Sequence, residues 1–381
     1  MSLSFEFVLA LSIVYGTSYL LKFLERYEIP VLAVEILAGI IFGSVLGLVT
    51  PSTPGFNVIA SMAAFGLLLI MFDAGLELDP GLIGDNPVRV AKLGALTFLL
   101  PFLSGVGLGI FLGLDTFASF LVGVTASTTS LGLVHPLLED FELLAGEEGQ
   151  LILSVTVLND ILSVVVLAYG LALTYGGGIL PIVVVTAALL FFLYVAPVHL
   201  SSYLSTLLED RIFDNTVKFS IFFAVAFAWI MDYLGVHAIL GSFFAGLLIA
   251  EITHEGHRIE QSVKPVINLV APVFFFFVGM QFTYTGFSPG DLWLLGAVTA
   301  IGLGSKMLGA YLGSLWTRTP GQTMKLLVAS MPGRLSISVA AAEIGLKRGL
   351  IGQTLYDSFI LLSIISVFLA SLMFRHFAPE N

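Results

Sequence analysis

LVASMPGRLSISVAAAE, residues 327–343, starts and ends like an apolar helix but carries Pro332 and Gly333 near its centre. Proline lacks a backbone donor and its ring clashes with the preceding turn, so a continuous helix is not expected through these residues. LVGVTASTTSLGLVHP, residues 121–136, is similar, because a run of hydroxyl residues interrupts an apolar stretch. The sequence therefore predicts two interrupted helices.

The composition around these stretches indicates a lipid environment. Of the 381 residues, 57% are apolar and 11% are charged, whereas about a quarter of a soluble domain is charged. A membrane-spanning helix needs about 20 mostly apolar residues. Thirteen such segments run over residues 4–24, 31–49, 57–77, 88–112, 115–138, 148–174, 179–203, 213–234, 236–251, 263–284, 291–316, 322–345 and 351–376. We predict an all-α, multi-pass membrane protein in a lipid bilayer, with no nucleic-acid surface and, since Cys is absent, no thiolate site.

The basic residues predict the orientation in the membrane. Eleven Lys and Arg residues lie in junctions after odd-numbered segments and two lie after even-numbered ones. Cytoplasmic loops carry the excess of Lys and Arg. We therefore expect a protein of the cell membrane with its N-terminus outside and its C-terminus in the cytoplasm.

An internal repeat relates the two halves of the chain. EILAGIIFG (Glu35–Gly43) is similar to SFFAGLLIA (Ser242–Ala250), and MFDAGLEL (Met71–Leu78) is similar to FFVGMQF (Phe276–Phe282). The second member of each pair lies seven segments after the first. Because seven is odd, the two copies face opposite ways across the bilayer, which predicts two inverted-topology repeats.

The same offset pairs the two interrupted segments with each other. Paired, interrupted helices at matching positions of two repeats indicate a substrate site near the middle of the membrane. Irregular backbone at that depth is tolerated only where it is buried in protein or lines a cavity. The sequence therefore predicts an ion site beside residues 121–136 and 327–343.

Asp160, within TVLNDILSV (residues 156–164), is the strongest candidate for that site. Ionisable residues in the middle of a membrane are rare and usually functional. Its carboxylate can bind Na⁺ or another monovalent cation, or a proton, but hardly both, which is the chemical requirement for exchange. Oxygens from Thr156, one turn earlier, and from Thr128 and Thr129 are expected to complete the cation's shell.

Four further polar residues are predicted to support Asp160. Asn159 either ligates the ion or ties down a broken helix. Asp73 and Arg334 have opposite charges and are expected to pair, with contact between Asp73 and the ion left open. Lys306 has three possible roles: it repels a second cation, balances Asp160, or releases a proton.

Six stretches together resemble the monovalent cation:proton antiporter superfamily, in the branch of Kef-like and NapA-like exchangers. They are EILAGIIFG, FDAGLELD, LNDILS, FFAGLLIAE, PVFFFFVGM and MPGRLSIS. The resemblance implies a homodimer of 13-helix subunits with crossed, unwound helices at the two interruptions and a cation-binding Asp160. It also implies a core domain (residues 88–174 and 291–376) that moves against scaffold and dimerisation helices (1–77 and 213–284), joined by a linker helix (179–203).

The resemblance implies a cation/proton antiporter without a cofactor and without enzymatic activity. Relatives with Asn before the Asp are usually electroneutral, whereas a Lys at the position of Lys306 is typical of electrogenic ones, so the stoichiometry stays open. Two alternatives also remain: a gated potassium efflux channel and a sodium-coupled organic-anion symporter, which also has crossed helices. No nucleophile or metal motif of an intramembrane hydrolase occurs in the sequence.

Overall fold

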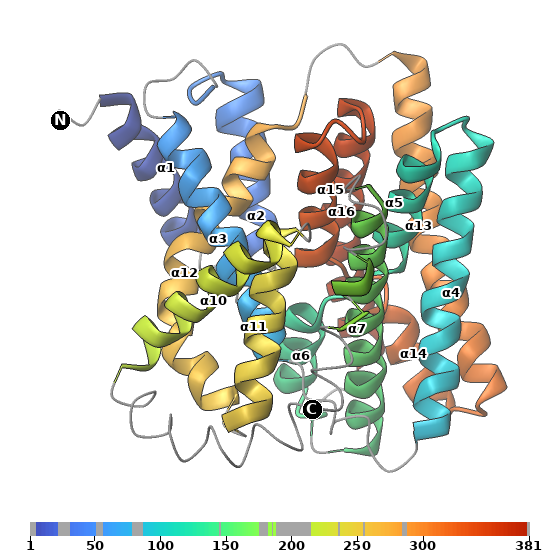
Figure 1. Cartoon of the computed structure of the whole chain (residues 1–381). Coiled ribbons are helices and arrows are strands. Elements are labelled where there is room, and N and C mark those ends of the chain that lie inside the picture. The colour runs from blue at the N-terminus through green and yellow to red at the C-terminus, as the bar shows by residue number, and fades with distance from the viewer. Residues whose placement is uncertain are drawn as a thin grey trace. The chain divides into compact units, whose positions relative to one another are not determined.

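The described part of the chain is helical throughout. The computed structural model describes residues 5–21, 31–50, 56–77, 87–144, 146–174, 182–184, 186–187, 215–234, 237–253, 256–283 and 288–378, and every regular element in these ranges is a helix (Figure 1). Eight helical segments are long and apolar enough to cross a membrane, if α5 and α6 are counted as one segment (Thr116–Asp140), and two shorter apolar helices cover Ala33–Val45 and Ala238–Ala250. The predicted helical membrane protein is confirmed. The count of thirteen helices stays a prediction, and most of the predicted segment 179–203 lies outside the described residues.

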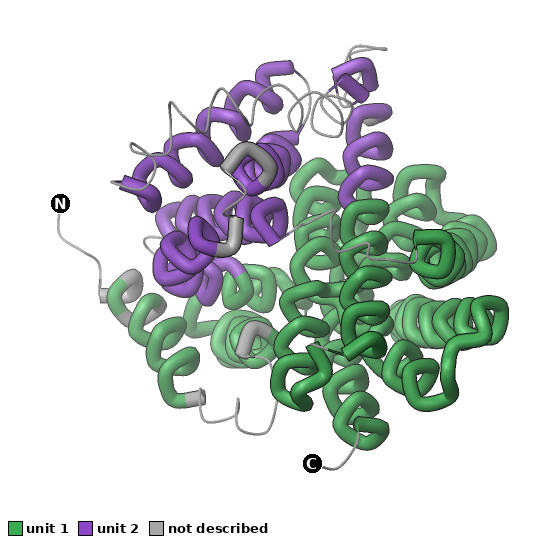
Figure 2. The backbone as a smooth tube through the Cα atoms, turned by 90° about the horizontal axis from the view of Figure 1, so that it is seen from below, with its two compact units in different colours: residues 1–56, 80–163, 275–381 green, residues 57–79, 164–274 purple. Residues whose placement is uncertain are grey.

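The helices belong to two compact units (Figure 2). Unit 1 comprises Met1–Phe56, Pro80–Ser163 and Phe275–Asn381. Its helices are α1 (Phe5–Leu21), α2 (Val31–Gly39) with the π-helical turn η2 (Ile40–Val45), α4 (Pro87–Phe111), α5 (Thr116–Ser127), α6 (Leu131–Asp140), the first part of α7 (Glu147–Thr174), α13 (Pro289–Trp316), α14 (Gly321–Ser330), α15 (Ser336–Lys347) and α16 (Gln353–Phe377).

Local signals fix several helix starts in unit 1. The Asp115 carboxylate accepts hydrogen bonds from the amides of Phe117 and Ala118 and so caps α5. Ser288 and Asp291 form a reciprocal capping box at the start of α13. Side-chain caps satisfy amides that have no partner inside the helix.

Packing in unit 1 brings α4 and α7 close to the interrupted helices. α4 packs on α5 and α13, and α16 packs on α13, α14 and α15. Gly94 of α4 allows a close approach to α7, because a Cβ at this position would lie 2.5 Å from a methyl group of Leu158. This contact puts the polar residues 97 of α4 and 159 of α7 next to each other.

Unit 2 comprises Asn57–Asp79 and Val164–Phe274. It holds α3 (Phe56–Leu76), the second part of α7, α10 (Thr216–Tyr233), α11 (Ala238–Thr253) and most of α12 (Gly256–Met280). α10 packs on α11. The hydroxyl of Ser242 in α11 donates a hydrogen bond to the Leu68 carbonyl of α3 at 2.7 Å.

In each unit, a helix crossing with similar geometry depends on a pair of glycines. In unit 1, a Cβ on Gly39 of α2 would overlap the Phe276 carbonyl oxygen, and the facing residue of α12 is Gly279. In unit 2, a Cβ on Gly75 of α3 would overlap the Phe243 carbonyl oxygen, and the facing residue of α11 is Gly246. Small residues let membrane helices pack backbone against backbone.

Candidate ion-binding site

The first predicted interruption is confirmed between α5 and α6. Helix α5 ends at Ser127 and α6 begins at Leu131. The hydroxyl of Ser127 donates to the Val124 carbonyl at 2.9 Å, and that of Thr128 lies 3.2 Å from the Thr125 carbonyl. Such side chains offer the backbone alternatives to helical bonding. The interruption leaves a helix C-terminus and a helix N-terminus facing the interior of unit 1.

The second predicted interruption, at Pro332 and Gly333, is also confirmed. Helix α14 ends at Ser330 and α15 begins at Ser336. The hydroxyls of Thr128 and Ser338 are 2.6 Å apart. The two interruptions therefore lie side by side, as the predicted site requires.

Asp160 lies at the N-terminus of α6. The Leu131 amide donates to Oδ2 of Asp160 at 3.2 Å, and Asp160 is 8% exposed. The N-terminus of a helix carries a partial positive charge and unbonded amides that favour an anion. The interruption thus provides a favourable position for a carboxylate that would otherwise be costly at this depth.

Two cations face the opposite helix end, the C-terminus of α5. The Lys306 ammonium donates to the Ser127 carbonyl, and Nη1 of Arg334 donates to the Thr125 carbonyl at 3.0 Å. Helix C-termini favour positive charge. The guanidinium also donates at 3.0 Å to two further main-chain carbonyls, those of residues 302 and 332, and Arg334 is fully buried.

Lys306 also bonds Asn159. Nζ of Lys306 donates to Oδ1 of Asn159 at 3.0 Å. Nδ2 of Asn159 donates to the Thr97 hydroxyl at 2.9 Å and to the Val155 carbonyl at 2.8 Å. Asn159 therefore connects α4, α7 and α13, and reaches the end of α5 through Lys306. Both predicted roles of Asn159, as an ion ligand and as an anchor of a broken helix, stay predictions.

The three predicted hydroxyl ligands differ in their surroundings. The Thr156 hydroxyl donates to the Ile152 carbonyl of its own helix at 2.9 Å. The Thr128 hydroxyl is hydrogen-bonded to the Ser338 hydroxyl. The Thr129 hydroxyl is buried, with Thr129 2% exposed, and has no hydrogen-bond partner among the described residues. Ion binding by the three hydroxyls stays a prediction.

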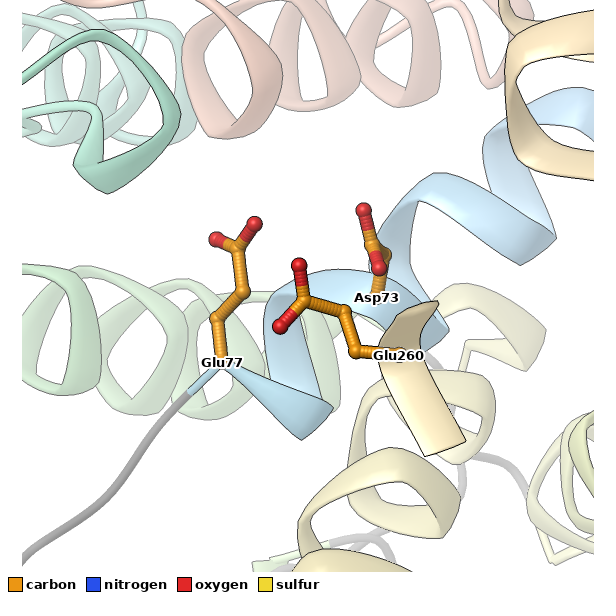
Figure 3. Close-up of side chains that lie close together, drawn as sticks. All are labelled: Asp73, Glu77 and Glu260. Atoms are coloured by element: carbon orange, nitrogen blue, oxygen red, sulfur yellow. The ribbon is translucent and has the colours of Figure 1, made fainter. Parts of the chain in front are cut away.

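Asp73 lies in unit 2, where its partner is a lysine that the sequence did not indicate. Nζ of Lys264 lies 3.5 Å from Asp73, 3.4 Å from Glu77 and 2.9 Å from Glu260, measured to one carboxylate oxygen of each. Carboxylate oxygens of the three acids lie within 4.8 Å of one another (Figure 3). The predicted pairing of Asp73 with Arg334 joins residues of different units and stays a prediction. Within its own unit, Asp73 contacts Lys264, and Arg334 bonds three main-chain carbonyls.

A known protein family matches nearly the whole chain. Residues 8–378 match the model of the transmembrane sodium/hydrogen exchanger family. The chain belongs to this family. The predicted relationship to cation:proton antiporters is thereby confirmed, and the exchanger family is a family of membrane transporters.

Similar exchangers cover nearly the whole chain. The Na⁺/H⁺-K⁺ antiporter GerN of Bacillus cereus is 24% identical, over 98% of this chain and 97% of its own. The Na⁺/H⁺ antiporter of Enterococcus hirae is 25% identical, over 93% and 94%. The structure of the sodium/proton antiporter MjNhaP1 from Methanocaldococcus jannaschii matches with a TM-score of 0.60 at 17% identity, covering 98% of this chain and all of that one, so the fold is shared.

Sequence reasoning missed three residues that the structure connects to the predicted ones: Thr97, Ser338 and Lys264. Thr97 is a lone hydroxyl in an apolar stretch, three residues after Gly94. Residues at this spacing lie on one helix face, so the pair could have indicated a polar contact where another helix approaches closely. Ser338 follows Pro332 and Gly333 within the interrupted stretch. Lys264 is four residues after Glu260, a spacing typical of a helical ion pair.

Proposed function

We propose that this exchanger-family chain exchanges a monovalent cation for H⁺, with Na⁺ as the principal cation and K⁺ or Li⁺ as alternatives. Asp160 binds the cation and the proton in turn. The observation that carries this proposal is the Asp160 carboxylate at the N-terminus of α6, buried beside two helix interruptions. The ions are substrates, and the proposal includes no cofactor.

The chemistry of the residues supports exchange at a single carboxylate. A proton on Asp160 removes the charge that attracts a cation, and a bound cation disfavours protonation. Thr129, Thr128 and Thr156 are proposed to supply neutral oxygens to the cation, with Asn159 and Arg334 holding the surrounding backbone. Asp73 is proposed to join the site in the course of transport.

An inverted repeat is part of the proposal, and the glycine crossings support it. If α2 corresponds to α11 and α3 to α12, then the contact of Gly39 with Gly279 and the contact of Gly246 with Gly75 are the same contact made twice. Each crossing joins a helix of one repeat to a helix of the other. This agreement is independent of the sequence match, because it concerns which glycines face each other.

The interrupted helices support the same symmetry. Asp160 of α7 accepts a hydrogen bond from the Leu131 amide at the start of α6. Ser366 of α16 accepts one from the Arg334 amide, two residues before α15, at 3.2 Å. In each half, a polar side chain of the following helix bonds the start of a half-helix, as expected if α5–α6 and α14–α15 are crossed, unwound counterparts.

We further infer an elevator-type mechanism. In this mechanism a core of residues 88–174 and 291–376 moves the site past scaffold helices of residues 1–77 and 213–284. Residues 179–203 would link them, and the scaffold would form a homodimer. The protein would lie in the cell membrane with the N-terminus outside and the C-terminus in the cytoplasm.

Proteoliposomes with an imposed pH gradient test the proposal. Addition of Na⁺ should dissipate the gradient in a saturable manner, and K⁺ and Li⁺ added separately rank the cations. Cation flux that is independent of the pH gradient would indicate the alternative channel. Proton movement that required an organic anion would indicate the symporter instead.

A further inference from the structure

The orientation of the Asn159 amide is fixed by three partners. Its nitrogen donates to the Thr97 hydroxyl at 2.9 Å and to the Val155 carbonyl at 2.8 Å, and its oxygen accepts from Lys306 at 3.0 Å. Thr97, Asn159 and Lys306 are each 0% exposed. Since no bulk water reaches these groups, each hydrogen bond depends on the protein partner named here.

Thr97 can act only as an acceptor toward Asn159. Its one hydroxyl proton is directed to the carbonyls of its own helix, with oxygen distances of 2.8 Å to Leu93 and 3.1 Å to Gly94. A hydroxyl has one donor and two acceptor lone pairs, so a lone pair is left for the Asn159 nitrogen. With the amide turned over, its oxygen would face this lone pair and its nitrogen would face the Lys306 ammonium.

The amide orientation decides which acceptor is offered to Lys306. A lysine ammonium has three donors and no acceptor. The Asn159 oxygen and the Ser127 carbonyl accept two of these donors. Asp160 is the neighbour of Asn159 in sequence, and its carboxylate would attract the same ammonium if the neutral acceptor were lost. A lysine bonded to Asp160 would compete with the transported cation.

We propose that Thr97 is a positioning residue for exchange: together with the Val155 carbonyl it accepts from the Asn159 nitrogen, keeps the amide oxygen on Lys306, and so holds the ammonium away from the Asp160 carboxylate that binds the cation. This inference rests on the proposed function of Asp160. It assigns the residue that separates the lysine from the ion site.

The test compares Thr97→Val, which removes the acceptor, with Thr97→Ser, which keeps it. In proteoliposomes, Thr97→Val should raise the KM for Na⁺ by about tenfold, the effect expected when one buried hydrogen bond to a charged network is lost. Its maximal rate should stay within about twofold of the wild type, because the carboxylate itself is unchanged. Thr97→Ser should behave as the wild type.

Thr17→Val is the matched control. The Thr17 hydroxyl of α1 also donates to carbonyls three and four residues back, at 2.9 Å and 2.7 Å. Thr17→Val therefore removes the same kind of hydroxyl as Thr97→Val does, but at a position without a contact to Asn159. The KM for Na⁺ should not change. If Thr97→Val does not fold, Thr97→Cys takes its place, because a thiol is a weak acceptor.

A structure of Thr97→Val tests the inference without transport. It should show the Lys306 ammonium displaced from the Asn159 oxygen toward Asp160. Lys306 unmoved, an unchanged KM, or Thr97→Ser as impaired as Thr97→Val would each overturn the inference. Absence of cation-driven proton movement in the wild type would overturn the proposed function, and the structure of the variant would still decide the role of Thr97.

Discussion

The ammonium of Lys306 is bonded to the neutral side-chain oxygen of Asn159, 3.0 Å away. A second carboxylate at position 159 would neutralise the lysine and would also be able to carry a proton. Asn159 does neither, so Asp160 is the one acidic side chain in the described part of the site, where Lys306 bonds Asn159 and Arg334 bonds main-chain carbonyls. This division of charge leads to predictions about transport and stability.

Asp160→Asn should abolish cation-dependent proton movement and leave the protein folded. An amide cannot exchange a proton for a cation, yet it can accept the hydrogen bond from the Leu131 amide. Removing a buried charge should keep or raise the melting temperature. Proteoliposome flux and thermal unfolding of the same preparation measure both effects.

Asp232→Asn is the control for this substitution, because Asp232 is exposed on α10. It should transport as the wild type does. Retained flux in Asp160→Asn would show that the exchanging carboxylate lies elsewhere.

Arg334→Lys should destabilise the protein nearly as much as Arg334→Gln. Three nitrogens of the guanidinium donate to the carbonyls of residues 125, 302 and 332, each at 3.0 Å. A single ammonium cannot span all three, and a lost hydrogen bond to a charged group costs about 1.5–3 kcal/mol. Thermal unfolding in detergent measures the loss. A lysine variant as stable as the wild type would mean that charge alone is needed at this position.

Lys264→Met should destabilise the protein more at pH 8 than at pH 5. In this variant the ammonium no longer faces the carboxylate oxygens of Asp73, Glu77 and Glu260, which lie within 4.8 Å of one another. Ionised carboxylates repel at high pH, and protonation at low pH relieves the repulsion. The melting temperatures of wild type and variant across this range test it.

Double variants test the predicted pair of Asp73 and Arg334. If these residues pair, adding Asp73→Asn to Arg334→Gln should recover part of the thermal stability that Arg334→Gln loses. If Lys264 is the partner of Asp73, adding Asp73→Asn to Lys264→Met should recover the stability that Lys264→Met loses instead. Double-mutant cycles separate the two cases.

The glycine crossings predict matched losses in the two units. Gly39→Leu and Gly246→Leu should each reduce the yield of folded protein, because a Cβ at either site would overlap a carbonyl oxygen of the facing helix. Gly304→Leu is the control, since a Cβ on Gly304 of α13 meets no described atom within 4 Å. Fluorescence-detected gel filtration ranks the three. Equal behaviour of all three would argue against close backbone packing at the crossings.

Both helix interruptions were predictable, because their signals are local. Pro332 and Gly333 break a helix wherever they occur in its centre, and hydroxyl residues 127–130 compete for backbone bonds. The membrane helices, and the choice of Asp160 as the candidate ion-binding residue, follow from the cost of polar groups in lipid.

The partners of the charged residues were not predictable in the same way. Leu131 and Asp160 are 29 residues apart, and Lys306 and Asn159 are 147 apart. Which of them meet depends on the rotation of each helix about its axis, to which close contacts such as Gly94 against Leu158 contribute. Their opposite charges suggested Arg334 as the partner of Asp73, whereas within unit 2 the ammonium of Lys264 lies 3.5 Å from Asp73.

Transport should be electroneutral, with one cation exchanged for one proton. Asp160 is ionised when it holds the cation and neutral when it holds the proton, and Asn159 cannot supply a second proton. Lys306 bonds two oxygens that suit a protonated amine, so its charge is expected to be constant through the cycle. The moving groups then carry the same net charge in both directions. A membrane potential would otherwise act on each net charge with about 2.3 kcal/mol per 100 mV.

Current on a solid-supported membrane, recorded beside dye-detected proton flux from the same preparation, measures the charge moved per turnover. Proton flux without sustained current is the expected result, and a clamped potential should not change the rate. The variant Lys306→Gln tests the alternative that Lys306 itself carries a proton. A sustained current in the wild type that disappears in this variant while flux persists would make Lys306 a proton carrier and the exchange electrogenic.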